Sequence, residues 1–62
     1  MEDDLLRVKV EKLLIEAEDC DLIGKLATDA QKRELFKKLA ADLRIMARDI
    51  EAKIAGRASE GA

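Results

Sequence analysis

Residues 26–33, which read Leu-Ala-Thr-Asp-Ala-Gln-Lys-Arg, decide the fold, because they contain the clearest break in an otherwise helical sequence. The carboxylate of Asp29 can accept a hydrogen bond from the free amide groups at a helix start, and Thr28 and Gln31 have the spacing of a capping box. A helix is therefore predicted to begin just after Asp29. The connection to the preceding helix is only a few residues long, so the two helices are expected to fold back antiparallel as a hairpin.

The ends of the two helices follow from capping signals. Asp3 or Asp4 can cap the start of the first helix, and Gly56 is expected to stop the second. The residues after Gly56 are small or polar and are predicted to form a disordered tail. The sequence thus predicts one all-α domain, residues 1–62, whose first helix, second helix and tail cover about 4–27, 30–55 and 57–62.

The composition agrees with long helices that need a partner. Charged residues make up 42% of the 62 residues, and there is no proline and one aromatic residue. A chain of this length buries too little of its own surface to be comfortably stable alone. One cysteine cannot form an internal disulfide, and the absence of histidine removes the ordinary structural zinc sites. Self-association is therefore the expected source of stability.

The same counts exclude several classes of function. Without histidine the chain has no Ser/His or Cys/His nucleophile pair, so we predict no enzyme, no cofactor and no metal site. No apolar stretch approaches the roughly 20 residues of a membrane span. The amino terminus, Met1 to Asp4, is acidic, unlike a signal peptide. These features predict a cytoplasmic protein with no membrane contact.

The second helix has one broad apolar face. Its predicted packing seam alternates steps of three and four residues and consists of Phe36, Leu39, Leu43, Met46 and Ile50. Two small residues, Ala40 and Ala47, flank this seam. Gly24 on the first helix is a weak point for helix stability that can also permit the close approach of a neighbour.

The first helix has two apolar stripes instead of one. The first stripe consists of Leu6, Val10, Leu13, Ala17 and Cys20. The second stripe lies roughly 160° around the helix and consists of Val8, Ile15, Leu22 and Leu26. One partner helix cannot cover both stripes, so two hairpins are expected to associate into a homodimeric four-helix bundle. The alternative is that the second stripe is a set of scattered surface residues. The predicted oligomer interface draws on both helices and comprises Leu6, Val8, Val10, Leu13, Ile15, Cys20, Leu22, Leu26, Phe36, Leu39, Leu43, Met46 and Ile50.

The best nucleic-acid candidate is a line of cations on the second helix, here called the basic row: Arg33, Lys37, Arg44 and Arg48. Guanidinium groups at these steps can follow phosphates along a groove. Neighbouring acidic residues and the lack of a stacking aromatic favour a solvated helix face instead. The net charge of −2 also opposes a strong field for nucleic acid over the whole molecule.

Two further features of the first helix have structural interpretations. Cys20 lies among acidic residues, which disfavour a thiolate, so it is expected to be a small core residue. The acidic cluster of Glu16, Glu18, Asp19 and Asp21 is spread around the helix and is interpreted as a solvated face rather than a cation site.

A set of short motifs resembles a pattern in small uncharacterised proteins of alphaproteobacteria, particularly rhizobia. The motifs are Ala17-Glu18-Asp19-Cys20, Leu26-Ala27-Thr28-Asp29, Arg33, Leu35, Leu39-Ala40 and Met46-Ala47. The resemblance covers roughly residues 17 to 51 and implies a bacterial helical hairpin of no established activity. This chain has Ala30 where that family often has proline. In length and layout the chain also resembles Rop, a plasmid copy-number regulator whose hairpins dimerise and bind paired RNA loops.

The combined prediction is a non-enzymatic helical hairpin that associates with itself and acts as a small interaction or regulatory module. An unidentified protein is the other expected partner, and nucleic acid is less favoured. The alternative prediction is a Rop-like nucleic-acid-binding regulator that uses the basic row, Arg33, Lys37, Arg44 and Arg48.

Overall fold

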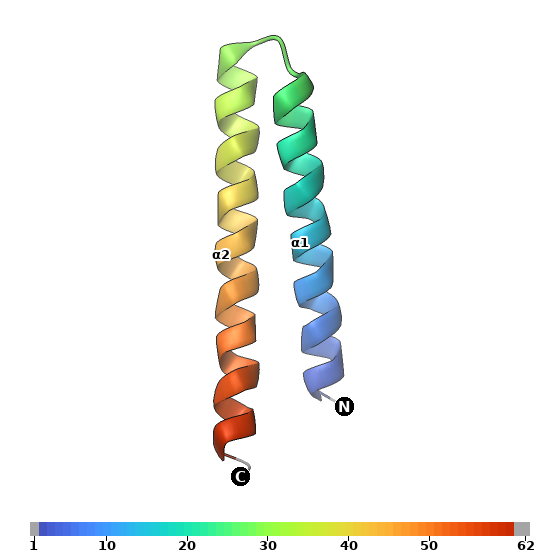
Figure 1. Cartoon of the computed structure of the whole chain (residues 1–62), viewed down its shortest axis with the longest axis vertical. Coiled ribbons are helices and arrows are strands. Elements are labelled where there is room, and N and C mark those ends of the chain that lie inside the picture. Colours follow the sequence, from blue (N-terminus) through green and yellow to red (C-terminus); the bar gives the residue numbers. More distant parts are fainter. Residues whose placement is uncertain (1, 61–62) are drawn as a thin grey trace.

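The chain forms an antiparallel hairpin of two long α-helices. The computed structural model describes the backbone of residues 2–60 and the side chains of residues 4–56. Helix α1 spans Glu2–Leu26 and helix α2 spans Ala30–Glu60 (Figure 1). The extents of 50 × 15 × 10 Å are those of two helices side by side, and no third layer covers either flat face within the described part of the chain. The prediction of an all-α hairpin is confirmed.

The turn between the helices is closed by the residue that the sequence singled out. The backbone N–H of Gln31 donates a hydrogen bond to Oδ1 of Asp29 at 2.8 Å, and the Arg33 N–H donates to the Asp29 carbonyl oxygen at 3.0 Å. Asp29 is therefore the N-cap of α2, as predicted. At the other side of the turn, the Ala27 N–H donates to the Ile23 carbonyl oxygen at 3.0 Å, which completes the last turn of α1.

The two helices pack through a register that pairs small residues with large ones. Gly24 faces Phe36, since a Cβ atom built on the glycine would lie 3.4 Å from the Phe36 Cβ atom. One heptad along each helix from that pair come Ala17 of α1, which is buried, and Leu43 of α2, which packs against the central cluster. The central cluster continues the alternation and consists of Val10, Leu13 and Ala47, with Leu43 and Ile50 packed against it. This size matching lets the backbones approach closely in the half of the hairpin next to the turn.

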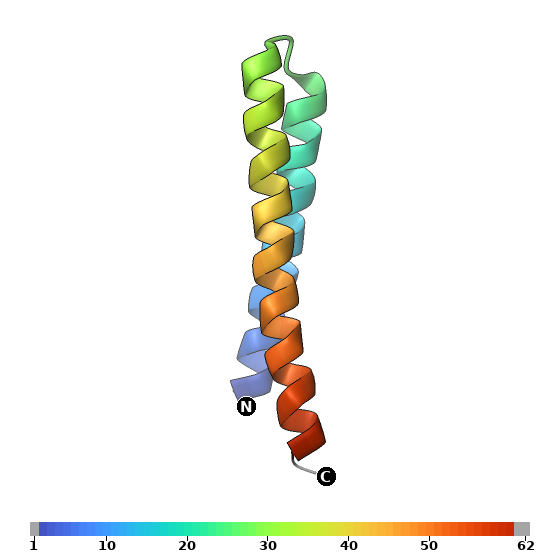
Figure 2. The ribbon, with the colours of Figure 1, turned by 90° about the vertical axis from the view of Figure 1, so that its left-hand side faces the viewer.

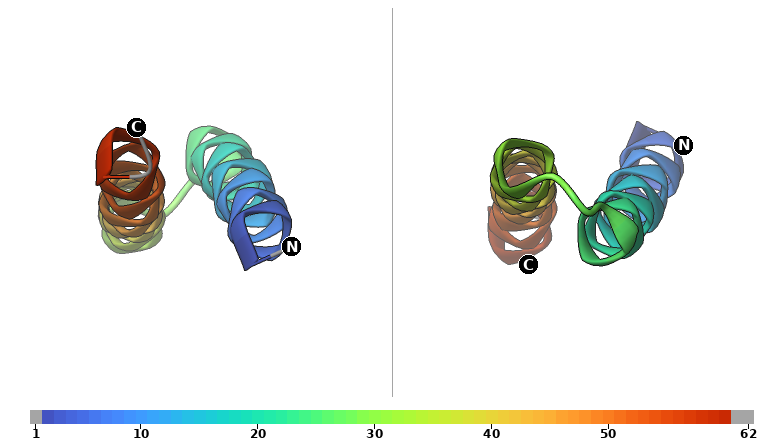
Figure 3. Two further views of the ribbon diagram at one scale, coloured as in Figure 1. Left: turned by 90° about the horizontal axis from the view of Figure 1, so that it is seen from below. Right: turned by 90° about the horizontal axis from the view of Figure 1, so that it is seen from above.

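The helices separate toward the open end of the hairpin, where the termini lie (Figure 1). In that half the partly or fully buried residues of both helices are large: Leu6 and Val10 on α1, and Ile50 and Ile54 on α2. Large side chains on both helices hold the two backbones further apart than Gly24 and Phe36 do near the turn. Views from the side and along the axis show that α1 and α2 also cross at an angle (Figures 2 and 3).

Both outer helix ends differ from the sequence prediction. Helix α1 begins at Glu2, so Asp3 and Asp4 lie within its first turn and are not its N-cap. Helix α2 continues through Gly56 to Glu60, so the tail predicted at 57–62 is wrong for residues 57–60. The reason is that Gly56 has no positive φ and does not form a C-cap. Residues 61–62 lie outside the described residues.

Neither helix could cross a bilayer. Over the described residues, no stretch of α1 or α2 is both long enough and apolar enough to form a membrane span.

Candidate interaction surface

The first stripe of α1 faces α2. Val10, Leu13 and Ala17 are buried there, and Leu6 and Cys20 are half-buried. These residues were predicted to contribute to an oligomer interface or its core, and the structure places them in the packing of one chain. The α2 residues Phe36, Leu43 and Ile50, which were predicted for the same interface, are half-buried in the same intrachain packing.

The second stripe of α1 faces away from α2. Its four side chains, Val8, Ile15, Leu22 and Leu26, are between 49% and 74% exposed. No element of the described chain lies on that side of α1. The second stripe is thus a row of exposed apolar side chains on the single hairpin, with Lys12 and Asp19 between them, and its role as an interface stays a prediction.

Sequence reasoning overlooked one member of this surface. Leu5 is 73% exposed and lies three residues before Val8, which is one helical turn along the same side of α1. The spacing from Leu5 through Lys12 and Asp19 to Leu26 is one heptad at each step. That repeat was visible in the sequence, although the two charged residues within it hide the pattern from a search for apolar residues alone.

Two residues of the predicted seam of α2 are exposed in the single hairpin, so their place in an oligomer interface stays a prediction. Leu39 and Met46 remain 40% and 49% exposed, whereas Ala40 and Ala47 are fully buried against α1. Helix α2 is therefore oriented so that Ala40 and Ala47 enter the packing against α1, whereas Leu39 and Met46 do not. Alanine has the smaller side chain, and the closer approach of the two backbones buries the first stripe more completely.

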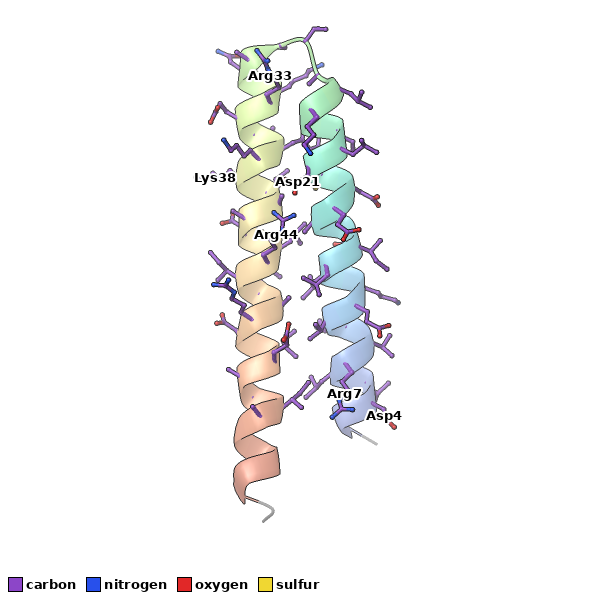
Figure 4. All side chains as sticks on the ribbon, viewed as in Figure 1. Asp4, Arg7, Asp21, Arg33, Lys38 and Arg44 are labelled. Atoms are coloured by element: carbon purple, nitrogen blue, oxygen red, sulfur yellow. The ribbon has the colours of Figure 1, made fainter. Side chains whose placement is uncertain are left out.

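One ion pair joins the two helices. The guanidinium Nη2 of Arg44 donates a hydrogen bond to Oδ2 of Asp21, on the face of the hairpin shown in Figure 4. This hydrogen bond, with the positive charges of Arg44, Lys25 and Lys37, holds the pKa of the Asp21 carboxyl below its ordinary value. The same bond raises the pKa of Arg44. Both side chains are partly exposed, so the pair sets the relative orientation of the helices more than it adds stability.

The ion pair changes the interpretation of the basic row. Arg33, Lys37, Arg44 and Arg48 are all exposed on α2, but Arg44 turns toward α1 and is bound to Asp21. The row was predicted to face away from the packing. Its central guanidinium is instead committed to a carboxylate, and Glu18 adds a second negative charge near it.

A groove lies beside the turn of the hairpin. Its walls carry both signs of charge and consist of Asp21, Gly24, Lys25, Ala30, Arg33, Glu34 and Lys37. Three cations, Lys25, Arg33 and Lys37, stand there beside two carboxylates, those of Asp21 and Glu34. The groove does not concentrate one charge, and the described residues around it provide no nucleophile paired with a base.

The remaining candidate residues occupy ordinary structural positions. Cys20 is a free thiol that is half-buried and lies outside the central cluster, so the expectation of a buried core residue is met only in part. The acidic residues Glu16, Glu18 and Asp19 are exposed. Among the described side chains, no group of three histidine, cysteine, aspartate or glutamate residues converges on a point where a metal ion could bind.

Comparisons with protein-family models, curated proteins and solved structures find no match to this chain. The resemblances to rhizobial hairpin proteins and to Rop therefore stay predictions.

Proposed function

We propose that two copies of the hairpin associate as a homodimeric four-helix assembly, and that this dimer acts as a non-enzymatic interaction or regulatory module. The observation that carries the proposal is the exposure of the second stripe. Val8, Ile15, Leu22 and Leu26 present a ridge of large apolar side chains along the side of α1 opposite α2. A long row of exposed, large apolar side chains on one side of a helix is typical of a protein interface.

The small core of the single hairpin supports the same proposal. Its buried side chains are those of Val10, Leu13, Ala17, Ala40 and Ala47, of which three are alanines. No large side chain among the described residues is fully buried. Hydrophobic stabilisation scales with the apolar area removed from water, so one hairpin gains little of it. Association would bury the second stripe and supply the missing area.

The chemistry of the side chains favours a binding role over a catalytic one. The chain has no histidine, and the pair of groups with perturbed pKa values, Asp21 and Arg44, neutralise each other on the surface. Neither is poised to transfer a proton near neutral pH. We expect the module to act in a reducing compartment such as the cytoplasm, because its one cysteine is a free thiol within the helix packing.

A second candidate function is nucleic-acid binding by the basic row. It is favoured by the exposure of Arg33, Lys37 and Arg48 along α2, and a dimer would present two copies of the row. It is opposed by the ion pair that removes Arg44 from the row. The interaction module is therefore the preferred function. In this proposal the dimer binds a further protein as its partner.

Sedimentation equilibrium at micromolar concentration tests the proposal. We expect a species of twice the chain mass for the unmodified protein. Ile15→Glu should dissociate it, because a carboxylate would have to be desolvated in the middle of the interface. The matched control is Ala41→Glu, which adds the same charge at an exposed position of α2 and should leave the dimer intact. A folded monomer at all concentrations would defeat the proposal, and helicity measured by circular dichroism distinguishes it from an unfolded chain.

A further inference from the structure

The outward side of α1 carries a complete heptad row, of which the second stripe is a part. The row alternates steps of three and four residues and consists of Leu5, Val8, Lys12, Ile15, Asp19, Leu22 and Leu26. All seven residues are exposed in the hairpin. We call this set the outer row. Its five apolar members have the spacing of knobs-into-holes packing against another helix.

The two charged members of the outer row have opposite signs and symmetric places within it. Lys12 and Asp19 lie one heptad apart, and Ile15 lies between them. Toward each end the row continues with apolar residues, Leu5 and Val8 before Lys12, and Leu22 and Leu26 after Asp19. Reading the row backwards therefore gives the same pattern of apolar positions, with the lysine and the aspartate exchanged.

This pattern distinguishes the two ways in which a second copy of α1 could lie along the outer row. In a parallel pair each residue meets its own copy, so Lys12 would face Lys12 and Asp19 would face Asp19. In an antiparallel pair related by a two-fold axis, a contact from one residue to another is repeated in reverse. Lys12 then lies within about one helical turn of Asp19 of the partner subunit, and both charged residues gain an opposite charge.

We propose that the outer row binds a second copy of this chain in antiparallel orientation, with the two-fold axis between Lys12 and Asp19. This inference rests on the proposed function and specifies the interface that it requires. Ile15 lies beside its own copy near the axis, and Val8 lies beside Leu22 of the partner subunit. Among the described side chains, the one ion pair within a chain joins Asp21 to Arg44, so Lys12 and Asp19 have no such partner inside the hairpin.

The position of the outer row also determines the order of the helices in the dimer. The row lies on the side of α1 opposite the packing with α2, so each α1 is held between its own α2 and the partner's α1. The two α1 helices are central and the two α2 helices are peripheral. Helix α2 also exposes large apolar residues, which are Leu35, Leu39, Ile45 and Met46. Leu35, Leu39 and Met46 follow a shorter row that Asp42 interrupts, Ile45 lies apart from that row, and all four stay outside this interface.

Cross-linking with single cysteines tests the orientation. In a Cys20→Ala background, one variant carries Val8→Cys and a second carries Leu22→Cys, and each is first shown by sedimentation in reductant to be dimeric. A short bis-maleimide is then added to each variant alone and to the re-equilibrated mixture. We expect the mixture to give a covalent dimer that contains one chain of each variant, whereas the Val8→Cys variant alone gives little product.

Charge reversal provides an independent measurement. Lys12→Glu places a glutamate beside Asp19 of the partner subunit and is expected to raise the dimer dissociation constant about tenfold. The double variant Lys12→Glu with Asp19→Lys restores an opposite pair and should recover the original affinity. In a parallel dimer the single change would exchange one like-charge contact for another and leave the affinity unaltered.

The outcomes separate this inference from the proposed function. A monomer under all conditions overturns both. If the Val8→Cys variant cross-links to itself, the dimer is parallel. If the mixture gives no cross-link, the dimer uses another surface. Either result overturns the antiparallel interface and leaves the proposed dimer standing. Loss of the dimer in Met46→Glu together with its survival in Ile15→Glu would transfer the interface to α2 and overturn the role of the outer row.

Discussion

Gly24 of α1 lies directly against Phe36 of α2, so that the position without a side chain faces the Phe36 Cβ atom and the adjacent backbone of α2. A Cβ atom on Gly24 would lie 3.4 Å from the Phe36 Cβ atom and 3.6 Å from the Arg33 carbonyl oxygen. Both are ordinary van der Waals separations. The glycine therefore permits a close approach of the two helices next to the turn, and the site has room for a methyl group and little more.

Replacing Gly24 by alanine is expected to stabilise the hairpin by about 0.5 to 1 kcal/mol, because alanine has the better helix propensity and its Cβ fits beside Phe36. Gly24→Leu should instead destabilise it by about 1 to 3 kcal/mol through overpacking. Thermal unfolding followed by circular dichroism, at one fixed protein concentration, measures both. A leucine that is tolerated as well as alanine would mean that the helices are further apart at this layer.

Leu43 and Leu39 differ in environment although both belong to the apolar face of α2. Leu43 packs against the central cluster, so Leu43→Ala should cost about 2 to 3 kcal/mol of unfolding free energy. Leu39 is 40% exposed beside that cluster, and Leu39→Ala should cost less than about 1 kcal/mol. Urea titrations of the two variants give the comparison. Equal losses would indicate that α2 is rotated toward the seam predicted from the sequence.

The ion pair between Asp21 and Arg44 makes part of the stability depend on pH. The folded state lowers the pKa of Asp21 below its ordinary value of 3.8, so the contribution is present above that value and is lost as the pH falls through the lower folded pKa. Asp21→Asn should therefore be less stable than the unmodified protein at neutral pH, and the two should converge in acid. Arg44→Gln serves as the control, because it should give the same loss and no further loss when combined with Asp21→Asn.

The basic row is expected to bind nucleic acid weakly at most. We expect no complex with a mixed pool of RNA and DNA in gel shifts at tens of micromolar protein and physiological salt, because Arg44 is neutralised by Asp21. A tight complex that weakens steeply as salt rises would favour the second candidate function. Lys37→Glu with Arg48→Glu should then abolish that complex while leaving the ion pair between Asp21 and Arg44 in place.

The local features of this protein were determined by its sequence. Asp29 caps α2 because a short carboxylate side chain bonds to an amide two residues away, which requires no tertiary contact. The close approach at Gly24 and the two apolar stripes of α1 follow from residue size and helical periodicity in the same way. The second stripe could be recognised for this reason as an apolar side of α1 that one partner helix would leave exposed, and the structure shows it exposed.

The rotation of α2 was decided only by the tertiary structure, and the outer ends of both helices could not be read from the capping signals of the sequence. The apolar face of α2 is wide enough to present either Leu39 and Met46 or Ala40 and Ala47, and the choice depends on the shapes of the α1 side chains that meet it. Gly56 ends a helix only if its backbone adopts a positive φ, which its neighbours do not impose. Arg44 reaches Asp21 because packing brings together residues that are distant in the sequence. The long arginine side chain is flexible, so its orientation depends on the carboxylate that packing places near it.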